Sequence, residues 1–129
     1  MAFVEERVRE IEHKYAHLIQ DLLVLRLTEE TLRLVLVLND GTTLRVAERW
    51  QGGTLMRYSY YWLDASNELK TGWDNSPHHK RLETFPHHKH IGEQAERMPS
   101  YEVCLEDVVA VLEKEMGRPS GTPEKAAGG

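Results

Sequence analysis

Between residues 22 and 74 the chain alternates apolar and polar side chains, and short turn signals interrupt this alternation. The pattern constrains the fold more than any other feature. Leucines at every second position from Leu32 to Leu38 would line one face of an extended strand. Asp40 and Gly41 follow, and glycine tolerates the positive φ that tight hairpin turns need. We therefore expect five strands, over 22–27, 31–39, 42–50, 54–64 and 68–74.

Helical periodicity flanks these strands on both sides. Apolar residues recur at intervals of three and four from Val4 to Leu22, which predicts a helix over about residues 2–19. The same spacing from Leu105 to Met116 predicts a second helix, which Gly117 would end. Short turns between successive strands imply antiparallel pairing. The expected fold is α+β: an antiparallel β-meander of about five strands with an N-terminal and a C-terminal helix packed on it, forming one domain over 1–117 before a flexible tail over 118–129.

Composition narrows the class of protein. The chain has 129 residues, of which 40% are hydrophobic, and no apolar run reaches the length of a membrane span. Its charged N-terminus is unlike a secretory signal, so we expect a cytoplasmic protein. The single cysteine, Cys104, excludes an internal disulfide. Net charge is -5, yet residues 32–91 carry eight basic and six acidic side chains, which leaves a local anion-binding surface open.

The segment 73–90 concentrates the residues that could carry chemistry. Five of the seven histidines lie between His78 and His90, and four of them form two pairs that each follow a proline. Histidine suits proton transfer because its unperturbed pKa lies near 6.5. RNA can be cleaved in this way, with one group taking the 2′-hydroxyl proton and another protonating the leaving oxygen. The candidate catalytic residues of this histidine-rich loop are His78, His79, His87, His88, His90 and Asp74.

Basic and aromatic residues near the histidines are candidates for substrate binding. The cations would hold phosphate, with Lys89 as the group that stabilises its charge, and the aromatic rings would stack on bases. The aromatic residues of 54–64 are nevertheless more typical of half-buried core, and Asn75 is also typical of a turn. The candidates are Tyr58, Tyr60, Trp62, Trp73, Asn75, Lys80, Arg81 and Lys89.

Two alternatives to acid–base catalysis stay open. His88 and His90 would lie on one side of an extended segment, where Asp74 could add a carboxylate and complete a site for zinc or another divalent transition metal. The spacing matches no established metal motif, and a histidine-rich tract alone is a weak metal signal. The other alternative is a solvated loop whose imidazoles only bond to the backbone.

Several stretches of the chain together resemble a known family. Three stretches are similar to the TumE-like toxins of type II toxin–antitoxin systems: Tyr58, Tyr60 and Trp62, then "GWDNSPHH" (72–79), then "TFPHHKH" (84–90). The resemblance implies a toxin that a helix-turn-helix antitoxin binds and neutralises. Toxins of such modules are often ribonucleases. Family members often have histidine where this chain has Tyr61.

Three hypotheses follow from the sequence. The favoured one is a metal-independent RNA-cleaving toxin, for which no cofactor is needed. The others are a metal-dependent nuclease or phosphoesterase, and a non-enzymatic module that binds a protein or nucleic acid. The strand over 32–38 is apolar on both faces, so it is either central in the sheet or covered by a partner, which leaves a homodimer open.

Overall fold

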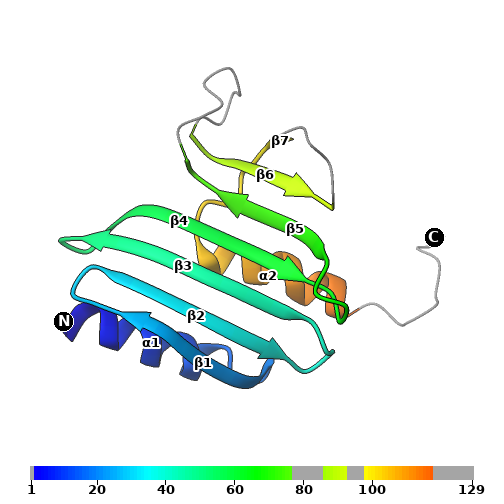
Figure 1. Ribbon diagram of the computed structural model, residues 1–129, viewed down its shortest axis with the longest axis horizontal. Helices are drawn as coiled ribbons and strands as arrows, with labels where there is room; N and C mark the ends of the chain where they lie inside the picture. The colour runs from blue at the N-terminus through cyan, green and yellow to red at the C-terminus, as the bar shows by residue number, and fades with distance from the viewer. Residues whose placement is uncertain (1, 77–85, 93–97, 118–129) are drawn as a thin grey trace.

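The computed structural model describes residues 2–76, 86–92 and 98–117, and its single sheet follows the order of the chain (Figure 1). Each strand pairs antiparallel with the next. The two helices are α1 (Ala2–Lys14) and α2 (Leu105–Met116). The strands are β1 (Ile19–Leu27), β2 (Thr31–Leu38), β3 (Thr43–Gln51), β4 (Thr54–Leu63), β5 (Leu69–Asp74), β6 (His88–Ile91) and β7 (Met98–Pro99).

This architecture confirms the predicted α+β meander, with two corrections. The sheet has seven strands instead of five, because part of the segment expected to be a loop pairs with β5 and extends the sheet. Strand β6 could not be predicted from the sequence, because its side chains are mainly histidines and a lysine and do not alternate between apolar and polar. Helix α1 ends at Lys14, since Leu18 lies in a turn and Leu22 lies in β1. The predicted tail, 118–129, lies outside the described residues.

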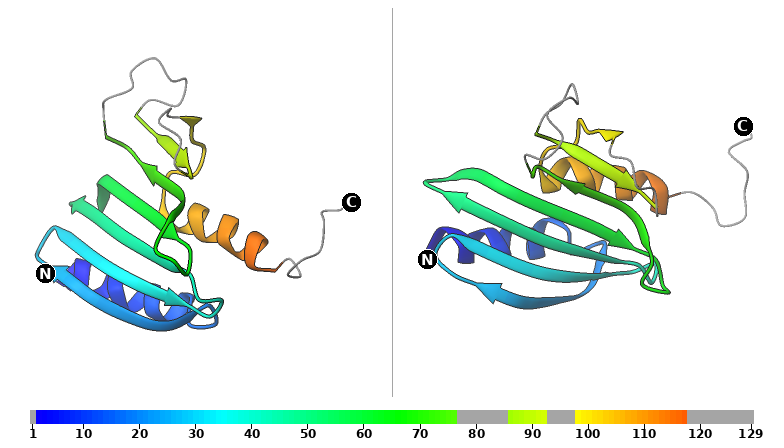
Figure 2. Two further views of the ribbon diagram at one scale, coloured as in Figure 1. Left: turned by 45° about the vertical axis from the view of Figure 1, so that its right-hand side comes forward. Right: turned by 45° about the horizontal axis from the view of Figure 1, so that its top comes forward.

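Both helices pack on the same face of the sheet (Figure 2). That face carries the alternate residues of β2 to β5, among which Leu34, Val46 and Tyr60 are almost fully buried. The other face is here called the open face, because no helix in the described part of the chain covers it. Neither described helix is long and apolar enough to cross a membrane. The core therefore forms a single layer between the helices and one side of the sheet.

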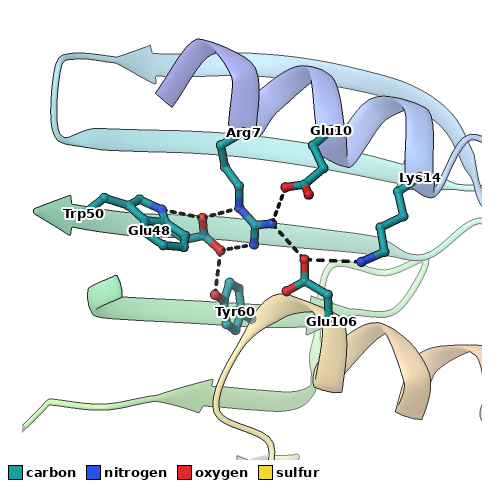
Figure 3. A network of polar contacts seen from close by, with 7 residues as sticks. All are labelled: Arg7, Glu10, Lys14, Glu48, Trp50, Tyr60 and Glu106. Atoms are coloured by element: carbon teal, nitrogen blue, oxygen red, sulfur yellow. Dashed lines mark hydrogen bonds and ion pairs between the residues drawn. The ribbon is translucent and has the colours of Figure 1, made fainter. Parts of the chain in front are cut away.

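An ionic network ties both helices to the centre of the sheet (Figure 3). Arg7 of α1 donates two hydrogen bonds to Glu48 of β3, at 3.0 and 2.9 Å, and a third to Glu106 of α2 at 2.8 Å. Glu48 also accepts hydrogen bonds from the Tyr60 hydroxyl at 2.6 Å and from the Trp50 indole at 2.9 Å. Its side chain is fully buried, so these donors replace the water that a carboxylate would otherwise bind.

Candidate functional site

Three polar side chains meet on the open face where β5 pairs with β6. The register places Asp74 opposite His88 and Gly72 opposite His90. Side chains of paired positions lie on one face and successive side chains alternate, so Asp74, His88 and His90 share the face away from the helices. We call these three residues the carboxylate–imidazole cluster. The sequence predicted that they could act together, and the described structure brings them together.

Short distances join the members of this cluster. Nε2 of His88 lies 2.8 Å from Oδ1 of Asp74, and Nε2 of His90 lies 3.5 Å from Oδ2. The ring centroids of the two histidines are 5.3 Å apart. One ligand atom from each residue lies within 4.8 Å of the others. The His88 side chain is 3% exposed and the His90 side chain 13%, so His90 offers more surface to a substrate.

Asp74 is held in its ionised form. Burial opposes ionisation, but Ser76 donates hydrogen bonds to Oδ1 from its backbone N–H at 2.9 Å and from its hydroxyl at 2.7 Å. These bonds, together with the nearby imidazoles of His88 and His90, place the pKa of Asp74 below its usual value. The cluster therefore contains a carboxylate at neutral pH.

Both ring nitrogens of His88 face hydrogen-bond acceptors. Nε2 faces the Asp74 carboxylate, and Nδ1 lies 3.2 Å from the backbone carbonyl of Pro86, which only accepts. An N–H on Nδ1 can donate to the Pro86 carbonyl, and a metal ion held by Nε2 and the Asp74 carboxylate would satisfy the other contact. Histidines that bind metals commonly donate their other ring N–H to a carbonyl or carboxylate. The local geometry is therefore that of a cation-holding site.

Tyr61 of β4 joins the cluster from the neighbouring strand. Its hydroxyl donates to Oδ2 of Asp74 at 3.4 Å. Gly72 lies opposite Tyr61 in the β4–β5 register, and a Cβ at this position would collide with the Tyr61 ring. The glycine thus lets the aromatic ring lie flat across β5 with its hydroxyl near Asp74.

Comparison with known proteins identifies the family. The model of the family described as "Toxin TumE" matches residues 5–116, which include all the described strands, α2, most of α1 and the whole cluster. The chain belongs to the TumE toxin family. It is accordingly a toxin of a toxin–antitoxin system, with an antitoxin as its partner. No curated protein and no solved structure matched the chain.

The histidines of this TumE-family toxin do not all share one site. His87 lies on the helix side of β6, where its Nδ1 is 2.8 Å from the Tyr58 hydroxyl and its ring stacks on that of Tyr58 at 5.8 Å. Burial, with a smaller contribution from His88, lowers the pKa of His87. The adjacent His87 and His88 therefore contact opposite faces of the sheet. His78 and His79 lie outside the described residues.

The predicted aromatic binding residues of the toxin form part of the core. Each is at most 4% exposed, which leaves no ring face on which a base could stack. They lie on the helix-covered face because the strand register aligns them with the buried residues of β3, such as Leu44 and Val46. These residues are Tyr58, Tyr60, Trp62 and Trp73.

The predicted polar binding residues also contact the protein itself. The Asn75 side chain accepts from the Tyr58 N–H at 2.9 Å and donates to the Met56 carbonyl at 3.1 Å, so it holds β4. Lys89 lies on the helix side and pairs with Glu102 at 3.4 Å. Lys80 and Arg81 lie outside the described residues.

Sequence reasoning missed the arginines of the open face. Arg33, Arg45, Arg49 and Arg57 occupy the polar phase of the alternation in β2, β3 and β4, and all four are exposed. A hollow of about 250 Å³ lies beside three of them and extends to Tyr61, Asp74 and Ser76. The sequence contained the signal for these arginines. Successive side chains of a strand alternate between the two faces of a sheet, so the residues between the core positions of β2, β3 and β4 must all lie on the open face.

Proposed function

We propose that this toxin is an RNA-cleaving enzyme and that the carboxylate–imidazole cluster is its reacting centre. The observation that carries the proposal is the contact of two imidazoles with one ionised, largely buried carboxylate on a sheet face that also presents arginines. Ionisable groups that are buried, coupled and next to a hollow are typical of catalytic sites.

In the proposed mechanism His90 carries a proton. Its imidazole takes the proton of a 2′-hydroxyl, the 2′-oxygen attacks phosphorus, and the bond from phosphorus to the 5′-oxygen breaks. A second group protonates that leaving oxygen, and His78 or His79 is the proposed donor. The products are a 2′,3′-cyclic phosphate and a free 5′-hydroxyl. Nearby guanidinium groups would stabilise the charge that develops on the phosphate.

Asp74 and His88 position this centre in the proposed mechanism. The Asp74 carboxylate, whose Oδ2 lies 3.5 Å from Nε2 of His90, would favour the tautomer with a proton on Nε2 and so leave Nδ1 as the basic nitrogen. His88 is 3% exposed and both of its ring nitrogens are engaged, so it serves better to hold the Asp74 carboxylate in place than to carry a proton to the substrate.

A metal-dependent phosphoesterase is the second candidate, and a specific observation favours it. Asp74, His88 and His90 present ligand atoms within 4.8 Å of one another, and the second nitrogen of His88 faces a carbonyl, as in many metal sites. Two imidazoles and a carboxylate suit zinc and other divalent transition metals. Such an ion would polarise the phosphate and lower the pKa of a bound water.

Cleavage of a labelled single-stranded RNA by the pure toxin, with and without a chelator, tests the proposal. Acid–base catalysis predicts cleavage that survives the chelator and yields cyclic-phosphate ends. His90→Ala should lower the rate by about 10²–10⁴-fold. His13→Ala, an exposed histidine on α1, is the matched control and should leave the rate unchanged. Cleavage lost with the chelator and restored by zinc would replace the first mechanism with the second. Absence of cleavage by folded toxin in both conditions would reject both.

A further inference from the structure

The open face carries a concentration of positive charge that the net charge of the chain conceals. Five arginines lie on it over β1 to β4, whereas the whole chain has a net charge of -5. The acidic residues of the same face within the described strands are Asp21, on β1, and Asp74, in the cluster. The arginines are Arg26, Arg33, Arg45, Arg49 and Arg57.

Two pairs of these arginines oppose each other directly. The register places Arg49 opposite Arg57 and Arg26 opposite Arg33. Like charges at directly opposed positions of adjacent strands destabilise a sheet. Glu30 offers limited relief, because its carboxylate is 4.0 Å from Arg49 and both side chains are about half exposed. The opposed arginines therefore still repel each other. An anion bound between their side chains would remove this repulsion.

The position of this charge relative to the cluster indicates what the anion is. Arg33, Arg49 and Arg57 line the same hollow as Ser59 and Tyr61, and the hollow ends at Asp74 and Ser76. Arg45 lies four residues before Arg49 on β3, or about 14 Å at the usual rise of a strand. The charge therefore extends over several strands. A single small anion would occupy one point of it, whereas a polyanion would occupy its length.

We propose that the arginines of the open face bind the phosphate backbone of a single RNA strand and lead it to the carboxylate–imidazole cluster. The proposal rests on the proposed function and adds the surface on which the substrate lies. Guanidinium groups bind phosphate through paired, charge-assisted hydrogen bonds, and such contacts hold a strand independently of its sequence.

Binding of a fluorescent 2′-O-methyl RNA of about twelve nucleotides tests this inference. The methylated probe lacks the 2′-hydroxyl that would attack phosphorus, and a gel checks that it stays intact. The variant Arg49→Gln/Arg57→Gln should weaken binding by at least about tenfold, since each lost contact is a hydrogen bond to a charged group. The dependence of log Kd on log salt should flatten by about 0.7 for each phosphate contact removed. Arg9→Gln, which removes one positive charge from an exposed position on α1, should bind as the wild type does.

Each result separates the inference from the proposed function. Equal binding by the double variant and the Arg9→Gln control would overturn the inference, even if the wild type cleaves RNA. Arginine-dependent binding without cleavage of ordinary RNA would support the surface and reject the ribonuclease. Displacement of the probe by polyglutamate as effectively as by unlabelled RNA would overturn the assignment to RNA and identify a site for acidic polypeptide. The melting temperature of the double variant, expected to be no lower than that of the wild type, excludes loss of binding through unfolding.

Discussion

The two faces of the sheet each hold a cluster of charged residues, and the clusters differ in how their charges are satisfied. On the helix side, Arg7 and Glu48 are almost fully buried, and they pair with each other and with further protein donors and acceptors (Figure 3). On the open face, His88 has acceptors on both sides and Asp74 is ionised. The charges of the first cluster are paired with protein groups, whereas the second cluster brings titratable groups together beside a hollow that Asp74 lines.

This difference separates a structural role from a chemical one. A buried ion pair whose partners are all fixed restricts how helices and strands fit together, but nothing in it is available to a substrate. A cluster that holds a cation next to an exposed hollow can exchange that cation. Burial of charge therefore indicates function only when the charged groups also border a space that a substrate can enter.

Removal of Arg7 should have the largest effect on stability. Arg7→Met leaves the Glu48 carboxylate buried without its cation, and the free energy of unfolding should fall by about 3–5 kcal/mol. Chemical denaturation followed by circular dichroism measures the change. Any RNA cleavage per folded molecule should persist, because the network contacts none of the open-face cluster.

A double variant tests whether the cost comes from the unpaired carboxylate. Arg7→Met/Glu48→Leu should recover part of the loss, since no buried charge remains. Recovery should be incomplete because the Tyr60 hydroxyl and the Trp50 indole lose their acceptor. A double variant less stable than Arg7→Met would contradict this account of the network.

Substitution of Gly72 should have the second-largest effect on stability, and it acts on the open face. In Gly72→Ala the new methyl group occupies space that the Tyr61 ring now fills, and overpacking of this kind costs about 1–3 kcal/mol of stability. Tyr61 would move away from Asp74, and RNA cleavage should fall by up to about a hundredfold through misplacement.

Tyr61→Phe provides the control for Gly72→Ala, since it keeps the ring over Gly72 and removes only the hydroxyl. It should retain most of the stability. Full stability in Gly72→Ala would show that the ring repacks at little cost and would remove the reason for glycine at this position.

The sequence predicted the first five strands and the two helices because their residues alternate or repeat with a clear period. The sequence also identified Asp74, His88 and His90 as site candidates, because carboxylates and imidazoles can transfer protons or bind metals. It did not predict β6, whose pairing depends on the edge of β5 and not on its own composition. It placed Tyr58 and Trp62 at the substrate, because residue type does not reveal which face a helix will cover. Arg7 and Glu48 occupy positions of a helix and a strand where the periodic pattern predicts apolar residues. Two residues of opposite charge at such core positions could have indicated the buried ion pair.

Acid should weaken the helix-side network through Glu106. Burial opposes its ionisation, but hydrogen bonding and attraction to Arg7 outweigh burial and lower the pKa of Glu106 in the folded state below the reference value of 4.5. A carboxylate with a lowered folded-state pKa stabilises the fold above the unfolded pKa, and this contribution is lost as pH falls through the folded value. Stability should therefore decline below about pH 4.5. Glu106→Gln should flatten that decline at a modest cost near neutrality, since the carboxylate is 33% exposed. Glu12→Gln, at an exposed position of α1, should leave the decline as it is in the wild type.

The smallest expected effect has the opposite sign and concerns the open face. Arg57→Gln removes one of two directly opposed arginines, so the free energy of unfolding should rise by about 0.2–1 kcal/mol. Arg45→Gln is the matched control, because Arg45 opposes Val35 and Tyr61 and carries no facing like charge. Equilibrium denaturation at low salt measures both, and the difference between the variants should shrink as salt screens the repulsion. If only Arg57→Gln raises the free energy of unfolding, then the positive charge of the open face lowers the stability of the fold. The ionic network on the helix side has the opposite effect. Equal stability of the two variants would mean that solvent already screens the pair, and the arginines would then need no bound anion to explain their placement.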